Sequence, residues 1–210
     1  SGFSSADDVT CPAGTLATMT SSDSITWTGT FTPASSTTDL VNTCDVGTGY
    51  TDDAGNTGVA GQSGNYKVDT VAPTVSSITF ADTALKAGDT SLVTIVFSEA
   101  VTGFANADLS IASGTMTAVQ NGAGDGITWT STFTPTADTD DNTNVLGITA
   151  NSYTDTLGNN GASGTSSNYV VETLLPTITM SIASDNTVTT LAKSGDEVTL
   201  SITASESVTS

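Results

Sequence analysis

Carboxylates are the residues of this sequence that offer the most chemistry. They number 22 among 210 residues, against 3 Lys or Arg and no His. The segments YTDDAGN at 50–56 and YTDTLGN at 153–159 each place an Asp and an Asn four residues apart around a glycine, a composition typical of tight turns. Mixed carboxylate and amide oxygens suit Ca²⁺, which takes six to eight hard ligands in a flexible shell. These turns are therefore candidate calcium ligands.

The same composition argues against most enzyme mechanisms. Without histidine, and with only two cysteines, the usual general bases and nucleophiles are missing. A glycosidase-type pair of carboxylates stays open, although most of the acids lie in predicted loops. The net charge of −19 argues against binding to nucleic acid or to anionic membranes, and no apolar run approaches the roughly 20 residues of a membrane span. We expect no catalytic site.

The elements that would position these acids recur along the chain. ITWTGTFTP at 25–33 returns as ITWTSTFTP at 127–135, NYKVDTVAPT at 65–74 as NYVVETLLPT at 168–177, and SEAVT at 98–102 as SESVT at 205–209. A period of about 103 residues indicates a tandem array. We predict three parts: the C-terminal part of a repeat without its first two strands, a complete repeat, and the first two strands of a further repeat. Their bounds are 1–70, 71–173 and 174–210.

Within the complete repeat, short apolar runs alternate with polar residues and are separated by Gly, Asn and Asp, a pattern typical of half-buried strands. Seven such strands in about 100 residues predict an all-β fold, an immunoglobulin-like β-sandwich. Named A to G, the predicted strands lie near 74–80, 91–97, 107–112, 115–120, 127–134, 144–151 and 167–172, the fourth being C′, tightly joined to C at Ser113-Gly114. We expect Trp129, and Trp27 in the first part, to pack inward; a sugar-stacking role is the alternative.

Strands that run alternately up and down bring several acids to one end of the repeat, facing the preceding linker. We predict a Ca²⁺ site there, because the start of strand A, the end of B, the start of C and the F–G loop all meet at that end. The alternative is that Asp and Asn serve only the turns and that the Glu is a solvated edge residue. The predicted ligands are Asp69, Glu99, Asp108, Asp155 and Asn159.

The other junction has only part of this set within the chain. Glu172 and Glu206 occupy the linker and strand-B positions, and the remaining loop ligands lie in the first part, at Asp52, Asp53 and Asn56. We therefore expect copies of the chain to join head to tail, residues 174–210 of one with 1–70 of the next. Covalent continuation of a longer protein and strand complementation between subunits both stay open. The first part alone would expose open sheet edges.

The two cysteines, Cys11 and Cys44, stand where the second repeat has Ile111 and Leu146. A joint exchange of two apolar strand positions for cysteine predicts a disulfide, which would stabilise the fold by roughly 3–4 kcal/mol and would favour an exported protein. Two free, buried thiols are the alternative.

The segment ALKAGDTSLVTIVFSEAVTGF at 84–104, followed by the TFTP strand and the YTDTLGN loop, resembles the bacterial Ig-like repeats of giant surface adhesins and biofilm-associated proteins. The resemblance covers essentially the whole chain. It implies extracellular β-sandwiches in tandem arrays, a stalk or fibre role, and frequent Ca²⁺ at domain junctions. We expect a calcium-stiffened extracellular stalk or filament; the alternative is an adhesive module whose loops bind a glycan or a cell surface.

Overall fold

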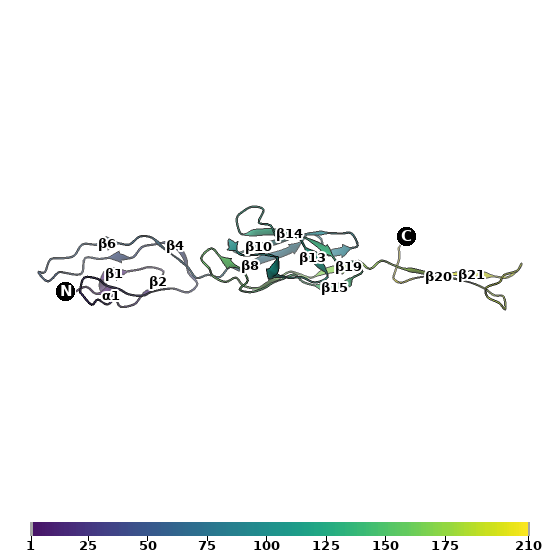
Figure 1. The fold of residues 1–210 in the computed structure, drawn as a ribbon, viewed down its shortest axis with the longest axis horizontal. Coiled ribbons are helices and arrows are strands. Elements are labelled where there is room, and N and C mark those ends of the chain that lie inside the picture. Colours follow the sequence, from purple (N-terminus) through teal and green to yellow (C-terminus); the bar gives the residue numbers. More distant parts are fainter. Residues whose placement is uncertain (1, 210) are drawn as a thin grey trace.

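The computed structural model of the chain describes residues 2–209. Its regular secondary structure is nearly all β, with 42 % strand and 3 % helix. The molecule is elongated, with three parts in a row (Figure 1). The first part lies at one end, the complete repeat in the middle, and a two-stranded hairpin at the other end. The predicted all-β class is confirmed.

The first layer of the middle repeat is a four-stranded antiparallel sheet in the order β13-β14-β10-β8. Alternation explains its central strand: Val93, Ile95 and Phe97 of β10 are at most 1 % exposed, while the residues between them face away from the core. The predicted common face of these three residues is confirmed. The strands are β8 (Val75–Phe80), β10 (Ser91–Phe97), β13 (Gly114–Met116) and β14 (Thr128–Pro135).

The second layer comes mainly from the C-terminal half of the repeat and is formed by two short sheets, β12-β16-β18 and β15-β19-β9. β9 runs parallel to β19, with Leu85 opposite Val171. A small β11-β17 pair and the 3-10 turn η1 (Asn106–Asp108) lie at the end nearer the first part. The strands are β9 (Ala84–Lys86), β11 (Val101–Thr102), β12 (Leu109–Ser110), β15 (Asp140–Asn144), β16 (Gly147–Ile148), β17 (Thr154–Asp155), β18 (Gly164–Thr165) and β19 (Tyr169–Glu172).

The core of the middle repeat lies between these layers and is rich in aromatic rings. Phe133 from the first layer and Tyr169 from the second are both fully buried, with ring centroids 5.2 Å apart. Phe80 packs on both of these rings. Full burial of one such apolar side chain stabilises a fold by about 1.5–3 kcal/mol. The middle repeat therefore has a core of its own.

The first part repeats the second-layer strands but not the whole first layer. β2 pairs with β3, and β4 pairs with β7. β3 covers only three residues, whereas its counterpart β14 covers eight. The elements are α1 (Ser5–Asp8), β1 (Val9–Thr10), β2 (Gly14–Leu16), β3 (Phe31–Pro33), β4 (Thr38–Asn42), β5 (Asp45–Val46), β6 (Gly61–Gln62) and β7 (Tyr66–Asp69).

The predicted disulfide between Cys11 and Cys44 is present, with their Cα atoms 4.3 Å apart. It continues the β1–β5 ladder, in which Thr10 lies opposite Asp45. In the middle repeat the next register pair beyond Ser110 and Gly147 is the apolar pair that replaces the cysteines.

The last part is a hairpin of β20 (Ile178–Ser184) and β21 (Val198–Ala204). Met180 lies opposite Ile202, and Ile182 lies opposite Leu200. Nearly every residue of both strands is exposed, because no second layer covers them.

Two expectations for the middle repeat need correction. The strands predicted as C and C′ are close in sequence, but β12 pairs with β16 in the second layer and β13 pairs with β14 in the first. Ser113, with a positive φ of 56°, lies at the sharp turn where the chain changes layer. The strand predicted near 144–151 starts earlier, at Asp140, and is interrupted after Asn144. Trp129 is half-buried against the core, as expected for a packing residue.

Candidate metal centre

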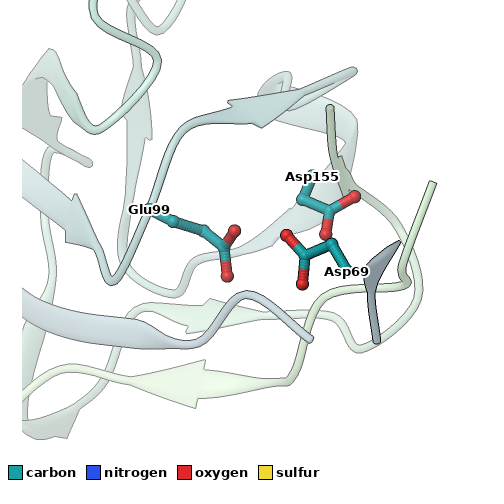
Figure 2. A group of neighbouring side chains, drawn as sticks. All are labelled: Asp69, Glu99 and Asp155. Atoms are coloured by element: carbon teal, nitrogen blue, oxygen red, sulfur yellow. The ribbon is translucent and has the colours of Figure 1, made fainter. Parts of the chain in front are cut away.

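Three carboxylates converge where the first part meets the middle repeat. Asp69 is the last residue of β7, Glu99 follows the end of β10, and Asp155 is the last residue of β17. One carboxylate oxygen from each lies within 4.8 Å of the other two. Figure 2 shows the three side chains turned toward a common space. Of the five residues that the sequence predicts to converge at this end, these three lie together.

Local hydrogen bonds hold Asp155 in place. Its Oδ1 accepts hydrogen bonds from the backbone N–H groups of Leu157, Gly158 and Asn159, at 2.7–2.9 Å. Gly158 has a φ of +96°, a backbone conformation that residues other than glycine seldom adopt. The TDTLGN segment therefore folds into a turn closed around its own Asp, and this turn fixes where the carboxylate points.

Asn159 ties the loop to the linker. Its Nδ2 donates to the backbone carbonyl of Asp69 at 3.0 Å and to Oδ2 of Asp155 at 2.7 Å. Both neighbours of the amide are therefore bound through its Nδ2. Its role in the structure is to join the preceding domain's last strand to the F–G loop.

Burial and the neighbouring charges make Glu99 harder to ionise. The pKa of Glu99 is raised above its ordinary value by burial and by the negative charges of Asp69 and Asp155. Burial also acts to raise the pKa of Asp155, but hydrogen bonds from the side chain and backbone of Asn159 and from the turn outweigh it, so this pKa is lowered. Asp155 is therefore held as an anion beside a Glu99 whose charge is unfavourable.

No basic side chain balances this charge among residues 2–209. The one ion pair there joins Lys86 and Asp89, outside the group. Each of the three carboxylates offers at least one oxygen to the common space, and carboxylate oxygens are the hard ligands that Ca²⁺ prefers. The residues present fit a divalent cation of this kind.

The remaining predicted ligands lie elsewhere. Asp108 is buried, and its Oδ2 accepts the backbone N–H of Ala105 at 2.8 Å, so it caps the η1 turn outside the acidic group. Glu172 and Glu206 line one surface hollow at the second junction. Asp52, Asp53 and Asn56 are exposed in the first part, at the far end of the molecule from that hollow.

The exposed loop of the first part already has the conformation of its counterpart. Oδ1 of Asp52 accepts the backbone N–H groups of Ala54 and Asn56, and Nδ2 of Asn56 donates to Oδ2 of Asp52 at 2.8 Å. The hydrogen bond from the Asn56 side chain lowers the pKa of Asp52. The loop therefore holds this conformation through its own hydrogen bonds.

Sequence reasoning missed the residues that anchor this end of the domain. The hydroxyl of buried Tyr153 donates to the carbonyl of Ala162 at 2.6 Å. Thr74 and Ser98 are joined by two hydrogen bonds at 2.9 Å, one of them from the Thr74 N–H to the Ser98 hydroxyl. The recurrence of Tyr50 and Tyr153 one repeat apart is the signal that points to the first of these anchors.

The fold defines a tandem array of β-sandwich domains with an acidic group at their junction. The bacterial Ig-like domain family matches residues 1–68 and 69–171, and the chain belongs to this family. The predicted resemblance to bacterial Ig-like repeats is therefore confirmed. This is a non-catalytic fold family. No curated protein and no solved structure matches the chain. Among the described residues, no helix has the length and apolar character needed to cross a membrane.

Proposed function

We propose that the chain is a structural repeat of an extracellular stalk or filament, and that calcium at its domain junctions sets the angle between neighbouring domains. The observation that carries the proposal is the convergence of Asp69, Glu99 and Asp155 within 4.8 Å. Because one of the three belongs to the preceding domain and two to the following one, a shared cation would join the domains directly.

The linker supports a stiff connection. Pro73 is buried, and its carbonyl accepts the backbone N–H of Ala162 at 2.9 Å, while Asn159 holds the carbonyl of Asp69. Across the same joint the three carboxylates repel one another, a force that opens it. A divalent cation would remove that force. The acidic surface would keep the rod soluble and oppose lateral association, and the disulfide supports an oxidising location outside the cell.

Calcium titration of the full chain tests this proposal. We expect calcium at about 100 times its dissociation constant to stabilise the middle domain by about 2.7 kcal/mol, which raises its melting temperature by about 10 °C or more. Isothermal titration calorimetry gives the affinity, and scanning calorimetry with calcium or with a chelator gives the shift. Magnesium and added sodium chloride separate a calcium site from a general effect of salt.

The matched variants are Glu99→Gln and Glu206→Gln, because both residues follow the second strand of a repeat. Of these two residues, only Glu99 has two further carboxylates beside it within residues 2–209. We expect Glu99→Gln to lose most of the calcium-dependent shift, while Glu206→Gln leaves the middle domain's shift unchanged. Equal responses to calcium in both variants and in the parent chain would remove the site as assigned.

A further inference from the structure

A threonine just after the last strand of each repeat is bonded to that repeat through both its backbone and its side chain. Thr70 directly follows Asp69 at the first junction, and Thr173 directly follows Glu172 at the second. Thr173 is only 4 % exposed, although it begins a linker. We propose that this threonine is a latch. Its hydroxyl fastens the linker to the domain that the chain is leaving, and at the first junction it thereby positions Asp69 for the metal centre.

At the first junction the latch joins Thr70 to the turn between β3 and β4. The hydroxyl of Thr70 donates to the carbonyl of Ala34 at 2.8 Å and accepts the backbone N–H of Thr37 at 3.0 Å. The backbone N–H of Thr70 donates to the carbonyl of Thr37 at 2.9 Å. The hydroxyl thus acts as donor and acceptor at once, which an alkyl side chain of similar shape cannot do.

The same bonds recur at the second junction, in the turn between β14 and β15. The hydroxyl of Thr173 donates to the carbonyl of Thr136 at 2.6 Å and accepts the backbone N–H of Thr139 at 3.0 Å. The backbone N–H of Thr173 donates to the carbonyl of Thr139 at 2.7 Å. The two receiving turns also share a backbone conformation, because Ser36 and Asp138 both have a φ of 53°. This recurrence indicates a feature of the repeat itself.

The following domain holds the first linker close to the latch. Two residues separate Thr70 from Pro73, whose carbonyl the following domain binds. The first of the two, Val71, donates its backbone N–H to Oδ1 of Asp69 at 3.1 Å. Asn159 of the following domain binds the carbonyl of Asp69. With the latch closed, the freedom of the joint is therefore confined to a very short stretch of backbone.

The latch also decides where the carboxylate of Asp69 stands. Asp69 ends β7 opposite Thr38 of β4, whose hydroxyl donates to its Oδ1 at 3.0 Å. The β4–β7 ladder holds the backbone before Asp69, and Thr70 holds it afterwards. The side chain therefore starts from a fixed point within reach of Glu99 and Asp155. Placing a ligand before the cation binds lowers the entropic cost of binding. Thr70 acts on the centre through Asp69 and is a positioning residue.

The second junction supplies a matched control within the same chain. Thr173 makes the same three bonds, but Glu172 beside it lies opposite Asp140, and neither belongs to the acidic group of the first junction. A change at Thr173 therefore opens a latch of the same design without touching the linker that carries Asp69. For its effect on calcium the inference rests on the proposed function, whereas the latch itself involves no metal.

Interdomain distances measured in a chelator test the latch alone. Spin labels at Thr32→Cys and Thr79→Cys, both at exposed strand positions, report the distance between the first part and the middle repeat. We expect Thr70→Val to broaden the distance distribution about twofold, because the released linker gains backbone freedom. Thr70→Ser retains the hydroxyl and should keep the parent distribution, as should Thr173→Val. Near-ultraviolet circular dichroism verifies that each variant is folded. An unchanged distribution in Thr70→Val, or equal broadening in Thr70→Ser, would overturn the latch.

Calcium affinity tests the positioning of Asp69. In isothermal titration calorimetry without the spin labels, we expect Thr70→Val to bind calcium about tenfold more weakly, an effect typical of residues that orient metal ligands. Thr70→Ser and Thr173→Val should bind calcium as the parent chain does. A loss of affinity common to Thr70→Val and Thr173→Val would reflect general destabilisation, and an unchanged affinity in Thr70→Val would show that Asp69 needs no latch. Either result would contradict the positioning role.

The two measurements distinguish this inference from the proposed function. If Thr70→Val loosens the joint in a chelator while the parent chain binds no calcium, the latch stands and the metal centre fails. If the parent chain and Thr70→Val bind calcium equally and have the same distance distribution, the metal centre stands and the latch fails.

Discussion

The middle repeat and the first part carry the same strand sequence, yet they use it differently. Residues 127–135 and 25–33 differ only at Ser131 and Gly29. In the middle repeat β14 spans eight residues between two partner strands, and Phe133 is fully buried. In the first part only three residues form a strand and Phe31 is partly exposed. The comparison teaches that the length and burial of a strand depend on its neighbours in the sheet as much as on its own residues.

The largest expected difference comes from removing the same ring in both parts. Phe133→Ala deletes a fully buried side chain that packs on Phe80 and Tyr169, and should destabilise the middle domain by about 4 kcal/mol. Phe31→Ala should cost the first part only about 1–2 kcal/mol in the monomer, because its cavity opens to water. Chemical denaturation followed domain by domain measures both, and equal losses would mean that the first part has a closed core.

Removing the disulfide is the next largest change. Replacing Cys11 and Cys44 by Ser should destabilise the first part by about 3 kcal/mol and leave the middle domain unchanged. The reciprocal change, Ile111→Cys with Leu146→Cys, occupies the same register positions and should form a disulfide in the middle repeat. Peptide mapping under non-reducing conditions identifies that bond. Its failure to form would show that the two ladders are not equivalent.

A buried asparagine offers a change that should affect both parts alike. Asn144 is 1 % exposed and its Nδ2 donates to the carbonyls of Asp141 and Tyr169; Asn42 is 2 % exposed and bonds its counterparts in the same way. Replacing either residue by Ala should cost about 1–2 kcal/mol. Equilibrium unfolding measures the loss of unfolding free energy in each part. Unequal losses would show that the two parts differ in more than the missing strands.

The smallest expected effect is the pH dependence of the acidic group without calcium. Because the pKa of Glu99 is raised in the folded state, its contribution is fully present below the ordinary value of 4.5 and is lost as pH rises through the folded pKa. Glu99→Gln should remove this loss, and Glu206→Gln should not. Denaturation midpoints measured between pH 4 and 7 in the presence of a chelator test this expectation. Parallel curves of midpoint against pH for the two variants would contradict it.

The pKa of Asp155 is lowered in the folded state, so its contribution has the opposite sign. It is present above the ordinary value of 3.8 and is lost as pH falls through the folded pKa. This loss lies at lower pH than that of Glu99, so the two effects can be separated in one titration.

Sequence periodicity predicted the all-β class, the repeats, the β10 face and the disulfide pair, because alternation and repetition can be read directly from the order of the residues. It also brought Asp69, Glu99 and Asp155 to one end of the domain, since antiparallel topology alone places them there. It did not predict that Asp108 caps a turn or that Asn159 presents its N–H groups, because both depend on which backbone atoms lie nearby. The separation of β12 and β13 into different layers was missed as well. The chain changes layer at a sharp turn around Ser113, whose positive φ no sequence pattern indicated.

Hydrogen exchange of the full chain, measured by mass spectrometry, tests most directly whether partner strands decide how much stable structure an identical sequence forms. We expect residues 127–135, which lie between two partner strands, to be protected. Residues 25–31 should exchange rapidly, because only one neighbouring strand pairs with them. Protection of residues 25–31 equal to that of residues 127–135 would contradict this account.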